Sequence, residues 1–127
     1  MNADDYQKDA LRTASSTGEP IEIGADVDGR ALLHGAIGMA TEVGELQDAI
    51  KRALFYGREL DTANVLEECG DVLWYLAVAL DAVGYTLGEA MGANLRKLRA
   101  RYPERFTTER AITRDLGAER EAMAARK

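Results

Sequence analysis

The chain has 127 residues, of which 46% are hydrophobic and 30% are charged, and its formal net charge is −6. These values are typical of one globular domain, and the negative charge argues against binding to nucleic acid or to an anionic membrane. The single cysteine, Cys69, excludes an intrachain disulfide, and its helical context favours inert packing. With an acidic N-terminus and no apolar run long enough to span a bilayer, the chain is expected to be cytoplasmic.

The first half of the sequence predicts two helices separated by a long loop. A short helix is expected at about 4–14, and the Gly- and Pro-containing stretch 15–30 reads as an internal loop. A long helix is expected at 31–56, with Gly57 ending it. Beside its apolar stripe runs a stripe of small residues, Gly35, Gly38 and Ala49, that includes two glutamates and would allow a helix or ligand to approach closely.

A third helix is expected at 61–83 and a fourth from about residue 86 to Pro103. Because 72–80 is apolar all round, the third helix should be the central, buried one. Three or four helices cannot cover such a helix alone, so the all-α bundle of four to five helices should be completed by oligomerisation. We expect a domain at 1–106 with its core at 31–106.

The segment 107–127 is charged and rich in alanine, with a weak helical stripe that Gly117 interrupts. It fits a helix packed on a partner subunit or a frayed tail.

Two pairs of carboxylates are the most informative feature. Glu42 and Glu45 are spaced i, i+3 on the second helix, and Glu68 and Asp71 have the same spacing on the third. Glu42 and Glu45 alone also fit a solvated face. Glu68 and Asp71 border the apolar segment, where unpaired charge is costly. If the two pairs face each other, a divalent cation is the simplest way to neutralise them, and Mg²⁺ is usual where phosphate is also a ligand.

Other chemistries fit less well. A di-iron bundle needs Glu-x-x-His on two helices, but the chain has one histidine, His34, preceded three residues earlier by Ala31. Nucleophilic triads fail for the same reason. Glu67 points about 100° away from Glu68 around the helix and reads as a capping or salt-bridge residue, with the metal shell as the alternative.

The fourth helix carries polar and basic residues on one side, namely Asn94, Lys97 and Arg101. They fit either a solvated basic face or a grip on the outer phosphates of a nucleotide.

The segments around Glu42-Val-Gly-Glu45, Glu68-Cys-Gly-Asp71 and Lys97-Leu-Arg-Ala-Arg101-Tyr-Pro together resemble the MazG-like nucleotide pyrophosphohydrolases of the all-α NTP pyrophosphatase superfamily. The resemblance covers about 32–106. It implies Mg²⁺, with Mn²⁺ as a substitute, held by the four carboxylates. It also implies a homodimer or homotetramer that cleaves nucleoside triphosphates to monophosphate and pyrophosphate, with water attacking the α-phosphorus.

The resemblance further places substrate contacts. Lys97 and Arg101 match positions near the phosphates, and Tyr75 matches a position that can border the base. We add Asn94 and Lys51 as further candidates for substrate binding. A phosphoribosyl-ATP pyrophosphohydrolase and a non-catalytic helical module that binds a nucleotide or a partner remain the competing interpretations, and the preferred base and sugar stay open.

Overall fold

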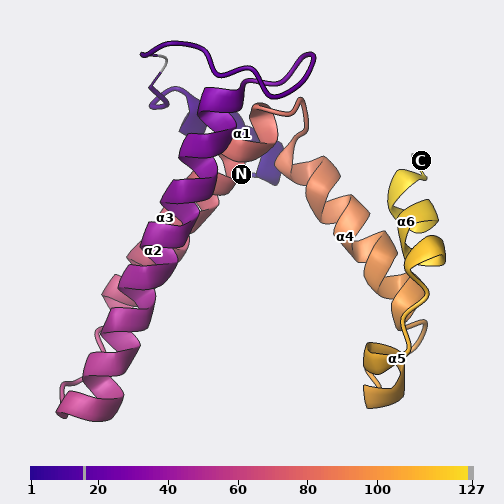
Figure 1. Cartoon of the computed structure of the whole chain (residues 1–127). Helices are drawn as coiled ribbons and strands as arrows, with labels where there is room; N and C mark the ends of the chain where they lie inside the picture. Colours follow the sequence, from indigo (N-terminus) through magenta and orange to yellow (C-terminus); the bar gives the residue numbers. More distant parts are fainter. Residues whose placement is uncertain (16, 126–127) are drawn as a thin grey trace. The chain divides into compact units, whose positions relative to one another are not determined.

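The computed structural model describes residues 1–15 and 17–125, and this part of the chain is helical without strands (Figure 1). The all-α prediction is therefore confirmed. The described residues form two compact units, 1–87 and 88 onward, while the division expected at 106 stays a prediction. The helices are α1 (Ala3–Leu11), α2 (Gly29–Tyr56), α3 (Thr62–Asp81), α4 (Leu87–Arg101), α5 (Thr108–Ile112) and α6 (Leu116–Ala124).

The first unit is built on a hairpin of α2 and α3, which lie side by side in Figure 1. Asp28 caps the start of α2 by accepting a hydrogen bond from the backbone of Ala31. Gly57 ends α2 in the left-handed region at φ +64°, as the sequence predicts. Asp61 then caps α3 by accepting from the backbone N–H groups of the next turn. These caps fix the short connection that brings the two acidic pairs onto neighbouring helices.

Glycines allow α2 to approach α3 closely. A Cβ atom on Gly35 would lie 2.8 Å from the Cβ atom of Ala79, and one on Gly38 would lie 2.1 Å from Cε1 of Tyr75. Both distances are too short for real atoms, so a larger residue would force the helices apart. The close approach predicted for the stripe of small residues is thus observed, and it seats the ring of Tyr75 against α2.

Helix α1 is held against α3 by two polar side chains. The buried amide of Gln7 donates to the carbonyls of Ala77 and Tyr85, at 3.4 and 3.1 Å, and accepts from the backbone N–H of Leu87 at 2.6 Å. The indole of Trp74 donates to α1 and to the residues that follow it. A satisfied buried amide specifies one arrangement of packed elements, so Gln7 fixes α1 over the carboxyl end of α3.

The apolar core of the first unit is small. Its buried residues are Ala77, Val78, Ala79, Ala82 and Leu87, whereas Leu73 is 47% exposed and Leu66 is 75% exposed. The prediction of a central helix buried all round is therefore met only near the carboxyl end of α3, where the consecutive residues Ala77, Val78 and Ala79 are buried, and not at Leu73. Cys69 is exposed as well, so the prediction that it is packed is wrong here, because its side of α3 faces away from α2.

The second unit shows that the tail is not frayed up to residue 125. Arg96 on α4 donates to the carbonyls of Ala122 and Met123 at the end of α6, at 3.1 and 3.2 Å. Asp115 caps α6 and precedes Gly117, which lies inside this helix rather than interrupting it. Helix α6 thus packs on α4 of its own chain (Figure 1). None of the described helices combines the length and apolar character that a membrane span needs.

Candidate metal centre

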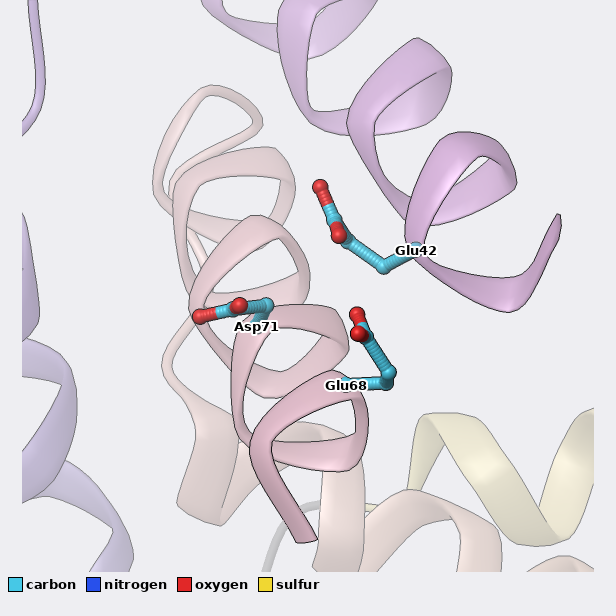
Figure 2. Close-up of side chains that lie close together, drawn as sticks. All are labelled: Glu42, Glu68 and Asp71. Atoms are coloured by element: carbon cyan, nitrogen blue, oxygen red, sulfur yellow. The ribbon is translucent and has the colours of Figure 1, made fainter. Parts of the chain in front are cut away.

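Three of the four predicted carboxylates meet between α2 and α3. Glu42 reaches from α2 toward Glu68 and Asp71 on α3 (Figure 2). One carboxylate oxygen of each residue lies within 4.8 Å of the other two. We call Glu42, Glu68 and Asp71 the acid cluster.

In the part of the chain that the structure describes, the acid cluster has hydrogen-bond donors but no basic partner. Glu68 is only 5% exposed, and it accepts a hydrogen bond of 2.7 Å from the side-chain amide of Asn64. Glu42 is half-buried and accepts from the hydroxyl of Thr41 at 3.3 Å, while Asp71 is exposed. Within residues 1–15 and 17–125, no lysine or arginine forms an ion pair with any of the three. Among the described residues, their negative charge is therefore not balanced by an ion pair.

The electrostatics of Glu42 reflect this shortage of cations. Burial raises the pKa of its carboxyl group, and the neighbouring charges of Glu45, Asp71 and Glu68 raise it further, although the hydrogen bond from Thr41 acts in the opposite direction. A cation among these oxygens would remove the repulsion. Three carboxylates, one of them buried, are a donor set that suits a hard divalent ion such as Mg²⁺.

Glu45 lies outside the cluster. It lines an open groove of about 1080 Å³ between α2 and α3, together with Glu67 and Glu68. Its charge still acts on Glu42, so it is close in electrostatic terms. The structure therefore brings three of the four predicted ligands together, and the metal-binding role of Glu45 stays a prediction.

An aromatic group adjoins the cluster along α3. The ring centroid of Tyr75 lies 4.9 Å from that of Trp74 and 5.4 Å from that of His34, and both pairs are edge-to-face. His34 is exposed and lies near the start of α2. The sequence reading missed this group because its three rings meet across two helices. It also missed Tyr6, whose pKa is raised by burial and by the charge of Asp71.

The predicted phosphate-binding residues have other contacts. The amine of Lys51 pairs with Asp48 at 2.5 Å, and Asp48 also accepts from Arg52. Arg101 makes two hydrogen bonds to Glu119, at 2.8 and 2.6 Å, within the second unit.

In the same unit Asn94 is exposed and Lys97 is half-buried. The substrate contacts of Asn94, Lys97, Arg101, Lys51 and Tyr75 stay predictions.

Comparison with known proteins identifies the family. The model of the family described as "MazG nucleotide pyrophosphohydrolase domain" matches residues 35–106. This segment is more than half of the chain and includes the whole acid cluster. No curated protein and no solved structure gave a significant match. From the family match and the carboxylates that it spans, we conclude that this chain belongs to the MazG nucleotide pyrophosphohydrolase family.

Proposed function

We propose that this protein is a Mg²⁺-dependent hydrolase, with Mn²⁺ as a substitute, that converts nucleoside or deoxynucleoside triphosphates to monophosphates and pyrophosphate. One observation carries the proposal. Three carboxylates from two helices converge, one of them is buried, and no basic side chain in the described part of the chain pairs with them. The family match over the same residues supports the reaction class. We further propose that the enzyme acts in the cytoplasm, where an exposed Cys69 would stay reduced.

The cluster residues would hold the ion, with Glu45 joining them from the adjoining groove. When bound, Mg²⁺ supplies positive charge to the phosphate oxygens and lowers the pKa of a coordinated water. Asn64 keeps the buried carboxylate of Glu68 in one orientation, because its amide donates to one oxygen and leaves the other free. The hydroxyl of Thr41 restrains Glu42 less, because it donates at 2.8 Å to the carbonyl of Gly38 and lies 3.3 Å from the carboxylate of Glu42.

The remaining residues would position the substrate. Tyr75 borders the base, with its ring held by the contact with Gly38 and by the edges of neighbouring rings. Lys97 and Arg101 would stabilise charge on the departing pyrophosphate, with Asn94 and Lys51 as further contacts. Arg101 would keep its bond to Glu119 and present its free N–H groups, since that carboxylate occupies only Nε and one terminal nitrogen.

Product analysis tests the reaction. With Mg²⁺ and a panel of triphosphates, we expect monophosphate and pyrophosphate in equal amounts. Release of orthophosphate and diphosphate would contradict cleavage between the α- and β-phosphates. Turnover of phosphoribosyl-ATP alone would favour the competing metabolic enzyme, and nucleotide binding without products would favour a non-catalytic module.

We also propose that the protein is a homodimer or homotetramer. In the first unit the large apolar residues that face solvent include Leu33, Ile37, Leu54, Phe55, Leu66 and Leu73. This is more apolar surface than a monomer usually exposes to water. A second copy of the chain could bury it in a symmetric interface. Light scattering at micromolar concentration should give at least twice the chain mass of 13.9 kDa. An active monomer would contradict the proposal.

A further inference from the structure

The groove that adjoins the acid cluster has a charged far end to which no role has been assigned. Its lining runs along α2 from Thr41 to Arg52 and along α3 from Ala63 to Glu68, and it includes Arg58 from the turn between the helices. Of its thirteen lining residues, six are acids and two are arginines. A groove of this composition would repel a bare polyanion, so an anionic ligand needs the metal at one end and a cation at the other.

Arg58 is the cation that is available for this purpose. Arg52 is already committed to Asp48, at 2.5 Å. The guanidinium of Arg58 is exposed and makes no ion pair or side-chain hydrogen bond within residues 1–15 and 17–125. Its five N–H donors are therefore open to an anion of matching geometry, such as a phosphate group.

The backbone fixes Arg58 at the mouth of the groove. Gly57 turns the chain at φ +64°, a backbone conformation that residues other than glycine rarely adopt. The N–H of Arg58 then donates to the carbonyl of Arg52 at 3.3 Å, which ties this residue to the last turn of α2. Arg58 is thus anchored at its backbone, while its side chain lines the groove.

The order of residues gives the groove a direction. Along α3 the buried Glu68 lies between the turn that carries Arg58 and the aromatic ring of Tyr75. On the facing helix, Arg52 lies seven residues beyond Glu45, or about 10 Å along the axis. The long side chain of Arg58, which starts at the turn beyond Arg52, can span most of this distance toward Glu45. The aromatic side suits a base, and the charged side suits phosphates.

We propose that Arg58 binds the terminal phosphate of a triphosphate substrate, at the end of the groove opposite the aromatic group. This inference rests on the proposed function. Arg58 would be a specificity-determining residue, because a diphosphate has no group that extends as far. The metal-bound end would select for phosphate chains in general, and Arg58 would select for their length.

The experiment compares the full-length chain with Arg58→Ala and Arg58→Lys. Calorimetry with inorganic tripolyphosphate and Mg²⁺ measures binding without any reaction of a nucleotide, and kinetics then give KM for a triphosphate and the corresponding diphosphate. The matched control is Arg12→Ala, which removes the same charge from an exposed site outside the groove.

We expect Arg58→Ala to weaken tripolyphosphate binding about tenfold or more, as for loss of a charged hydrogen-bond pair. Arg58→Lys should recover part of the loss, and Arg12→Ala should bind normally. The triphosphate KM should rise in Arg58→Ala while the diphosphate KM stays unchanged.

Three results would overturn the inference. Arg58→Ala could bind tripolyphosphate as well as wild type does, Arg58→Ala and Arg12→Ala could lose equal affinity, or wild type could fail to bind it. If wild type binds tripolyphosphate through Arg58 but hydrolyses no triphosphate, the proposed function fails and the assignment of Arg58 stands.

Discussion

Glu68 on α3 and Glu119 on α6 are equally buried, at 5% and 4% exposure, yet their surroundings are opposite. Glu119 accepts paired hydrogen bonds from Arg101 and from Arg114, with shortest distances of 2.6 and 2.7 Å. Glu68 has two acidic neighbours and one neutral donor, Asn64. In one case two cations contact an anion, and in the other three anions converge and form no ion pair with a described residue.

The pKa values follow these surroundings. Hydrogen bonds from Arg101 and Arg114 lower the pKa of Glu119 to about 2. In the acid cluster, burial and neighbouring carboxylates raise the pKa of Glu42 above its usual value. Glu119 is fully paired, and its structural role is to hold α6 on α4 through Arg101. The acids of the cluster, which form no ion pair within the described residues, repel one another, and such a group could hold a cation.

Substitutions in the acid cluster should have the largest effect. Glu68→Gln and Asp71→Asn keep the shape of each side chain but remove charge, so each should lower turnover on the order of 10²-fold or more while the helices persist. Glu45→Gln should do the same if the fourth carboxylate joins the site. Steady-state kinetics at saturating Mg²⁺ is the measurement.

The matched control for these variants is Asp81→Asn, which removes the same charge from an exposed carboxylate at the end of α3, outside the groove. It should retain most of the activity. Normal turnover in Glu68→Gln, or equal losses in Asp81→Asn, would mean that the cluster is not the reaction centre.

Glu119→Gln should have a local effect on the second unit. The amide cannot neutralise two guanidinium groups, so Arg101 and Arg114 would repel each other and α6 would loosen. We expect backbone amides of α6 to exchange about tenfold faster or more, with no change in α3. Glu121→Gln, on the same helix but exposed, should leave exchange unchanged. An equal effect of both substitutions would show that the ion pairs do not hold α6.

The smallest effect is a difference in pH dependence between the two units. Because the folded pKa of Glu119 lies below the usual 4.5, its contribution to stability is full above about pH 4.5 and is lost as the pH falls toward 2. Glu42 has a raised pKa, so its contribution in metal-free protein improves as the pH falls from neutral, when protonation relieves repulsion.

Trp74, the one tryptophan, reports on the first unit by fluorescence, and amide exchange reports on α6. We expect the melting temperature seen by Trp74 to rise slightly as the pH falls from 7 toward the usual 4.5 of a glutamate, while α6 loosens only below about pH 4.5. Loosening of α6 near pH 6 would contradict the pairing of Glu119.

Local signals in the sequence predicted most of the first unit. Gly57 and Asp61 end and begin helices by backbone rules that act within a few residues, and the i, i+3 spacing placed Glu68 and Asp71 together. The small residues Gly35 and Gly38 correctly indicated a close approach of two helices. Such features depend on residues that are close in sequence, so they can be predicted from the sequence alone.

Features that depend on distant contacts were missed. The docking of α6 rests on Arg101 and Glu119, eighteen residues apart, and its apolar stripe is too weak to predict it. The separation of Glu45 from the acid cluster depends on how α2 is rotated against α3, which spacing does not determine. The exposure of Cys69 has the same origin, since a helix residue is buried only where a partner covers it.

Titration with Mn²⁺ followed by electron paramagnetic resonance measures directly whether Glu42, Glu68 and Asp71 bind a divalent cation. We expect saturable binding to the wild-type chain, and an affinity at least about 10- to 100-fold lower in Glu68→Gln, with Asp81→Asn close to wild type. Equal Mn²⁺ affinity in wild type and Glu68→Gln, or no binding to wild type, would contradict this expectation.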